Sequence, residues 1–213
     1  EDFNREKEVI LEELKRSEDS PGRQIFQKSF KLTFSKEPYG RPIIGFKRTI
    51  KNATPAQLEK FYRDHYVPSK MGIVLVAPVG VNSERTKNIL KIIEKNFGKN
   101  VLKKTKVKST PRKKKTNEQD KAKVLCQPFD VTTPAMIFSF KVPHVEHEDI
   151  PALDLLSSVL GMGEMCRLYQ SLFYEKSLVT DVSAAVYTLS NSGMFYVFAD
   201  FEKTKDALQV SEA

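Results

Sequence analysis

A lysine-rich segment near the middle of the chain constrains the fold most, because it interrupts the hydrophobic patterns on either side of it. Residues 101–125 contain 10 Lys and Arg and 2 Asp and Glu, and they account for the whole net charge of +8. The segment has no aromatic residue that could stack on bases, and its Thr, Ser and Pro content is typical of a solvated linker. A polyanion-binding arm is the alternative. A chain of 213 residues divided in this way predicts two domains.

Both sides of this segment show the patterns of helices and strands. Before it, apolar spacing and helix start and stop signals predict helices at residues 4–18, 21–34, 54–66 and 82–97 and a strand at residues 71–76. After it, the patterns predict strands at residues 123–129, 132–143, 178–189 and 193–202 and helices at residues 149–163, 164–176 and from 203 onward. Strands with helices on one side, in two successive units, indicate an α+β fold.

The predicted division of the chain has three parts. Residues 1–100 form a first domain, residues 101–122 a basic linker and residues 123–213 a second domain. The chain opens inside a helical pattern, and its last helix has hardly begun when the sequence stops. We therefore expect the first domain to be truncated at its N-terminus and the second at its C-terminus.

Composition excludes several classes of protein. No run of about 18 apolar residues is present that could span a bilayer. The two cysteines, Cys126 and Cys166, are too few for a disulfide framework or a metal knuckle, so buried thiols are the default interpretation. No signal peptide is visible, and a chain that opens inside a helical pattern leaves open whether one was removed.

The first predicted helix carries a pair of acids on an apolar face. Residues seven positions apart on a helix lie about 20° from superposition, so Glu6 and Glu13 share one face, with Val9 and Ile10 between them. Acids embedded in an apolar stripe are costly unless a cation, a metal or a hydrogen-bond donor satisfies them. This face is therefore a candidate site. An acidic, solvated helix is the alternative, and spacing alone favours it.

Several segments together resemble a known family. They read, in order, "REKEVILEEL", "PYGRPIIG", "FYRDHYVPSKMGIVLV" and "LLSSVLGMGEMCRLYQSLFYEKSLVTDVSA". This ensemble is similar to the insulinase/pitrilysin family of zinc peptidases, in the branch that includes the mitochondrial processing peptidase. The resemblance runs from residue 1 to about residue 203. It implies an α+β fold made of two successive α/β-sandwich units of the metalloprotease type.

The resemblance also implies a metal site. In the family, one zinc ion is bound by the two histidines of an HxxEH motif and by a glutamate on a later helix. That glutamate matches Glu13, and Glu6 matches a second acid that lies beside the metal or relays a proton. This chain has no HxxEH, and the resemblance places that helix upstream of Glu1. We therefore expect this chain to be an internal fragment that is inactive by itself and does not hold the zinc ion.

The histidines and one family substrate-binding pair depart from the family pattern. His65 is interpreted as an ordinary helix-end histidine, and His144 and His147 imitate a metal motif with the wrong spacing. Many members carry an Arg and a Tyr, seven residues apart, that hold the substrate. Phe173 and Thr180 occupy those positions here. Because some members divide the zinc site and this pair between subunits, the resemblance implies a homodimer or a heterodimer with a related subunit.

Three functions remain open at this point. The first is a zinc metalloendopeptidase that cleaves peptides or unfolded protein segments, with this chain as one part of it. The second is a non-catalytic homologue that serves as a structural or substrate-presenting subunit. The third, a polyanion-binding module built on the linker, is the weakest, so no nucleic acid partner is expected. No membrane span is expected either, because no apolar run is long enough. The compartment is not determined, and the resemblance leans toward the bacterial periplasm.

Overall fold

The computed structural model describes residues 2–78, 80, 83–97, 122–205 and 207–212. Contacts group these residues into two compact units, one from residues 1–50 and 117–213 and the other from residues 51–116. The elements in chain order are α1 (Asp2–Glu18), α2 (Pro21–Thr33), η1 (Pro38–Gly40), α3 (Lys47–Asn52), α4 (Pro55–His65), η2 (Pro68–Lys70), α5 (Glu84–Phe97), β1 (Ala135–Val142), α6 (Ile150–Gly161), η4 (Tyr169–Glu175), β2 (Asp181–Thr188), β3 (Gly193–Asp200) and α7 (Ala207–Glu212).

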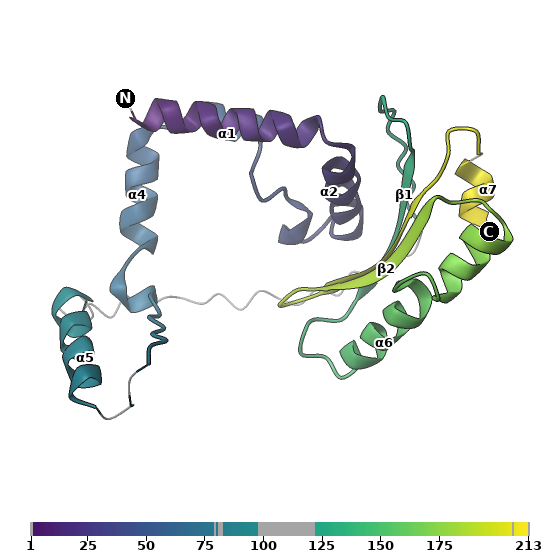
Figure 1. Ribbon diagram of the computed structural model, residues 1–213. Helices are drawn as coiled ribbons and strands as arrows, with labels where there is room; N and C mark the ends of the chain where they lie inside the picture. Colours follow the sequence, from purple (N-terminus) through teal and green to yellow (C-terminus); the bar gives the residue numbers. More distant parts are fainter. Residues whose placement is uncertain (1, 79, 81–82, 98–121, 206, 213) are drawn as a thin grey trace. The chain divides into compact units, whose positions relative to one another are not determined.

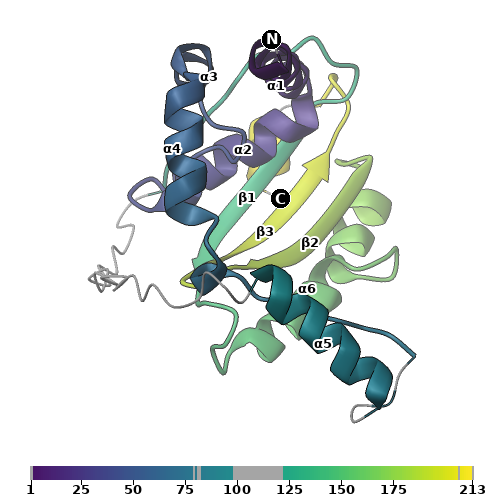
Figure 2. The ribbon, with the colours of Figure 1, turned by 90° about the vertical axis from the view of Figure 1, so that its left-hand side faces the viewer.

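A three-stranded antiparallel sheet organises the first unit. Its strand order is β1-β3-β2, so β3 lies in the middle and pairs with both neighbours (Figure 2). Successive side chains of a strand point to opposite faces. Met194 is 0% exposed and the next residue, Phe195, is 6% exposed. Both faces of the sheet are therefore covered.

Helix α2 covers one face of the sheet. The ring of Phe26 meets Tyr196 of β3 edge to face at 5.0 Å between centroids, and Phe30 meets Tyr187 of β2 in the same way at 5.2 Å. Edge-to-face pairs of this kind add to the free energy gained from burying their area. The helix thus brings residues near the start of the chain onto strands near its end (Figure 1).

Helix α6 and the π-helical turn η4 cover the opposite face, as Figure 1 shows for α6. The approach of α6 to β2 is very close at Gly161. A Cβ atom on this residue would lie 2.0 Å from the backbone nitrogen of Ala184. A glycine lets the helix lie almost directly on the strand, and this contact sets the distance between the two layers.

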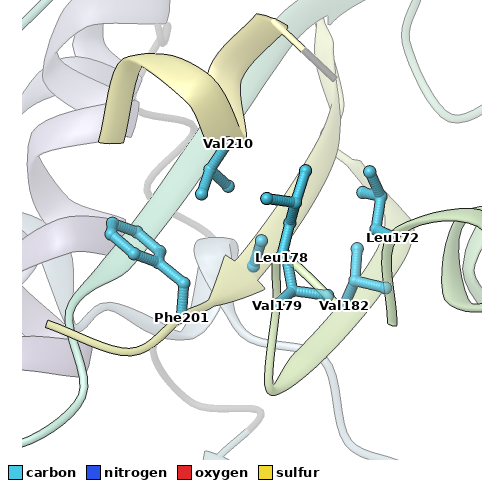
Figure 3. Close-up of a cluster of buried hydrophobic side chains, with 7 residues drawn as sticks. Leu172, Leu178, Val179, Val182, Phe201 and Val210 are labelled. Atoms are coloured by element: carbon cyan, nitrogen blue, oxygen red, sulfur yellow. The ribbon is translucent and has the colours of Figure 1, made fainter. Parts of the chain in front are cut away.

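A cluster of buried apolar side chains fills the space at the η4 end of this face (Figure 3). The members come from η4, the segment that follows it, β2, β3, the residue directly after β3, and α7, and they are Leu172, Leu178, Val179, Val182, Ala199, Phe201 and Val210. The cluster ties the short α7 to the sheet, since Val210 is 5% exposed although its helix has only six residues. The core of the described chain therefore lies in the first unit.

Helix signals in the sequence predicted most helices correctly. Thr54 and Gln57 form a reciprocal capping box at the start of α4, where Pro55 takes the first helical position. Ser83 accepts a hydrogen bond from the backbone N–H of Thr86 and so caps α5. The mixture of helices with an antiparallel sheet confirms the α+β class.

Two predicted strands are wrong in the described chain. Residues 71–76 and 123–129 form no ladder and are assigned to no regular element. Val74 and Val76 are 89% and 92% exposed, so the apolar run is extended but unpaired. A strand needs a neighbour for its backbone N–H and C=O groups, and hydrophobicity alone does not supply one.

The predicted domain boundaries at residues 1–100, 101–122 and 123–213 stay a prediction. Most of the basic linker lies outside the described residues, because residues 98–121 are not described. In the first unit, residues before residue 51 are grouped with residues that follow the linker. The sequence pattern did not indicate this long-range grouping.

We expect Gly161→Ala to destabilise the chain strongly. The added methyl would overlap backbone atoms of β2, which cannot move away as a flexible side chain could. The cost should be about 3 kcal/mol, at the upper end of the usual range for overpacking, and urea unfolding would measure it. Gly22→Ala is the matched control, because its Cβ would meet nothing within 4 Å and alanine favours a helix. A stable Gly161→Ala variant would contradict the close packing described.

Candidate metal-ligand helix

Helix α1 has the local signals of a stable helix end to end. Its 17 residues consist mostly of good helix formers, with Asp2 in the first turn and Lys15 and Arg16 in the last, where their charges complement the helix dipole. Leu14 is 5% exposed and is the buried residue of the helix. The helix is therefore anchored by one side, and the rest of its surface is accessible.

The paired acids lie on the accessible part of α1. Glu6 and Glu13 are both exposed, and the apolar side chains between them, Val9 and Ile10, are 55% and 39% exposed. Leu14 lies about 80° around the helix from Glu6, so the acid-bearing face is not the buried one. Among the described residues, Val9 and Ile10 are therefore not part of a core. This acid-bearing face is an apolar stripe with a carboxylate at each end, open to a partner.

Few interactions restrain the two carboxylates. Arg5 Nε lies 3.9 Å from Glu6 Oε1, with both side chains mostly exposed, so the pair contributes little to stability. Among the described residues, Glu13 makes no ion pair and no side-chain hydrogen bond. Carboxylate oxygens are ligands that zinc accepts. Glu13 therefore fits the role of a single ligand that an incoming metal could use without breaking an existing contact.

The described residues do not bring further metal ligands to α1. Among them, no three side chains of His, Cys, Asp and Glu are placed to hold a metal ion. His65 lies at the end of α4, where its Nδ1 lies 3.0 Å from the carbonyl oxygen of Phe61 and its ring stacks on the Phe61 ring. His147 Nδ1 lies 3.2 Å from the backbone nitrogen of Asp149, and its ring meets His144 edge to face. Each histidine thus has a local contact.

Phe173 and Thr180 differ in what they contact. Phe173 belongs to η4, stacks on Tyr169 at 4.7 Å between centroids and packs against the buried cluster. Thr180 is exposed, and its backbone N–H donates to the carbonyl oxygen of Asp200. The Phe173 side chain is therefore used for packing, and a π-helical turn, which often marks a functional position, surrounds it.

One polar pair beside Phe173 was missed by sequence reasoning. Tyr174 Oη donates a hydrogen bond to Glu164 Oε2 at 3.3 Å, and the negative charge of Glu164, together with desolvation, raises the pKa of Tyr174. The amide of Gln170 donates to the carbonyl oxygen of Glu164 and fixes this loop. The partners are ten residues apart and the turn between them is π-helical, so no α-helical spacing could have indicated the pair.

A second pair of acids faces across two strands. Asp181 of β2 lies opposite Asp200 of β3 in the sheet register. Burial first, and then the negative charge of Asp181, raise the pKa of Asp200. Both effects disfavour the ionised form of Asp200 in the folded state. This pair lies on the sheet and not on α1, and sequence spacing did not predict it.

The comparisons with known proteins identify the family. Residues 52–213 match the model described as the Peptidase M16 inactive domain, and this match covers more than half of the chain. The chain belongs to the M16 peptidase family. This confirms the resemblance to the insulinase/pitrilysin zinc peptidases. The matched region begins after α1, so Glu6 and Glu13 lie outside it.

Relatives of the M16 chain are named zinc proteases. This chain is 29% identical over 200 residues to the zinc protease PqqE of Helicobacter pylori, and the alignment covers 93% of this chain and 44% of the relative. It is 27% identical over 197 residues to the uncharacterized zinc protease YmxG of Bacillus subtilis, covering 92% and 45% respectively. The chain thus spans about half the length of the curated relatives it matches.

Solved structures confirm the fold of the M16 chain. A protease from Helicobacter pylori superposes with a TM-score of 0.73 at 21% identity, covering 99% of this chain and 50% of that one. Pitrilysin superposes with a TM-score of 0.58 at 16% identity, covering 93% and 21%. The fold class is therefore that of M16 peptidases. The roles assigned to Glu6, Glu13, Phe173 and Thr180 stay predictions.

We expect Asp200→Asn to reduce the loss of folding stability that the wild type shows as pH rises from 4 to 7. Because the pKa of Asp200 is raised in the folded state, the folded chain binds its proton more tightly than the unfolded chain does. Stability should therefore fall as pH rises from the ordinary aspartate value through the raised one. The variant removes this loss, so its stability relative to the wild type should be higher at pH 7 than at pH 4. Urea unfolding at both pH values measures this difference. An equal effect at both would contradict the raised pKa.

Proposed function

We propose that this chain is part of a zinc metalloendopeptidase and supplies Glu13 as the third zinc ligand. The observation that carries the proposal is the exposed pair of Glu6 and Glu13 on one face of α1, in a chain of the M16 family whose relatives are named zinc proteases. The sequence contains no HxxEH, and the proposal places the two histidine ligands in a segment that precedes Glu1.

The residues of α1 have distinct roles in this proposal. Zinc held by two imidazoles and one carboxylate keeps a fourth position for water and lowers the pKa of that water to about 7. Glu13 supplies the carboxylate, and among the described residues no side chain forms an ion pair or a hydrogen bond with it. Glu6, about two helical turns away on the same face, orients a histidine or accepts a proton near the metal. Val9 and Ile10, exposed between them, pack against the helix that brings the histidines.

The substrate and assembly follow from the family and stay proposals. The substrate is a peptide or an unfolded protein segment, and the working enzyme is a homodimer or a heterodimer with a related subunit. Phe173 packs against the core, and Thr180 carries no charge, so neither position offers the family's cationic contact to a peptide. A related subunit would then supply that contact.

The resemblance also leads us to propose an exported, periplasmic protein. No helix in the described part of the chain is both long and apolar enough to cross a membrane.

A non-catalytic role is the second candidate function. The matching family model is described as the inactive domain, and it covers residues 52–213. Together with Phe173 and Thr180 at the substrate-binding positions, this supports a structural or substrate-presenting subunit. Such a subunit would have no use for an exposed acid pair on either side of apolar side chains on α1. Zinc binding at Glu13 therefore separates the two functions.

We expect Glu13→Gln in the full-length protein to weaken zinc binding by at least about 100-fold. Outer partners of a metal ligand already change affinity by about 10–100-fold, and a ligand itself should matter more. Competition with a chelator of known affinity measures the effect, and peptidase activity should fall in parallel. The 213-residue chain by itself should not bind zinc tightly, because one carboxylate does not make a site.

Glu12→Gln is the matched control for this experiment. Glu12 is the neighbouring exposed glutamate and points about 100° away from Glu13 around the helix, so its loss should leave zinc affinity unchanged. Glu6→Gln should produce a smaller loss than Glu13→Gln. Full zinc affinity in Glu13→Gln would exclude Glu13 as a ligand and would favour the non-catalytic function.

A further inference from the structure

Helix α2 lies between α1 and the sheet in the first unit. Only Asp19 and Ser20 separate the end of α1 from the start of α2. The buried amide of Gln24 donates a hydrogen bond to the carbonyl oxygen of Ser17 at 2.9 Å, which fixes the angle between the two helices. Because Leu14 is also buried, α1 is held at its C-terminal end, close to Glu13. The end of α1 that carries Glu13 is therefore in contact with α2.

The sheet holds α2 along its length by ring contacts. Phe26 and Phe30, one helical turn apart, meet Tyr196 of β3 and Tyr187 of β2 edge to face. These four rings bring together residues on opposite sides of the basic segment. They set the distance of α2 from the sheet, but apolar surfaces can slide. A directional contact is needed to fix its position along the strands.

Two polar contacts at the C-terminal end of α2 supply this direction. Thr33 Oγ1 lies 2.8 Å from Ser139 Oγ of β1, and the ammonium group of Lys141 forms an ion pair with Glu37, just after α2. The side chains of Lys141 and Glu37 are 32% and 23% exposed, so water screens this pair less than the exposed pairs on α4. Ser139 and Lys141 are two residues apart on one strand and therefore point to the same face.

We infer that the three-stranded sheet positions Glu13 through α2, with Lys141 as the positioning residue. In this arrangement the domain described as inactive has a task in metal binding: it holds the helix that carries the third ligand. The part that concerns zinc rests on the proposed function, whereas the part that concerns α1 rests on the contacts alone. Loss of the Lys141–Glu37 ion pair lets the end of α2 shift along β1, and α1 moves with it.

The test uses Lys141→Met in the full-length protein, with two readouts. Zinc affinity is measured by chelator competition, and hydrogen exchange is measured for the amides of α1 and of β1, β2 and β3. We expect zinc affinity to fall about tenfold, as for the loss of an outer partner of a ligand. Exchange should become faster in α1 while the strands keep their protection. The charge-swapped double variant Glu37→Lys with Lys141→Glu should restore both.

Two further variants keep the test decisive. Lys60→Met is the matched control, because it removes an ion pair with Asp64 that is exposed and lies within one turn of α4. It should change neither readout. Thr33→Val removes the other polar contact at nearly constant shape, and it should change both readouts in the same direction even if Lys141→Met folds poorly.

The outcomes separate the two proposals. Unchanged zinc affinity and α1 exchange in folded Lys141→Met and Thr33→Val would overturn the positioning role. Faster exchange throughout the sheet as well as α1 would also overturn it, because the ion pair would then only stabilise the unit. If Glu13→Gln keeps its zinc, the proposed function fails, and the exchange readout still decides whether the sheet holds α1.

Discussion

Burial of the sheet on both faces is the constraint on which the rest of the structure depends. The central strand β3 carries Met194 and Phe195 on opposite faces, and both are almost fully buried. A three-stranded sheet cannot cover itself, so each face needs a helical layer. Helix α6, placed by Gly161, covers one face, and α2 covers the other. The start of the chain is thereby bound to its end.

This constraint gives the acid-bearing helix its position. Helix α1 contributes one buried residue, Leu14, and leaves Glu6, Val9, Ile10 and Glu13 exposed. A helix that exposed a half-apolar stripe for no purpose would lose the free energy that burial supplies. The exposed stripe, in a chain of the M16 family, is consistent with a surface that a partner covers.

The unpaired run at residues 71–76 shows what happens to an apolar segment that has no neighbouring layer or strand. Its apolar residues have the composition of a buried strand, yet Val74 and Val76 are almost fully exposed. Strand formation requires hydrogen-bond partners on a neighbouring chain segment, and the described residues offer none there. Helices such as α4 and α5 form without such a neighbour, because their backbone hydrogen bonds are internal and their caps, Thr54 and Ser83, are local.

The sequence by itself determined what depends on local chemistry. It predicted most of the helices, the α+β class, the strands β2 and β3, and the placement of Glu6 and Glu13 on one face, since each follows from spacing along a few residues. Only the tertiary structure decided which faces are buried. It placed α2 on the far strands, turned Phe173 toward the core, and joined Glu164 to Tyr174 and Lys141 to Glu37. These contacts join elements through packing, and periodicity within one element carries no information about its neighbour.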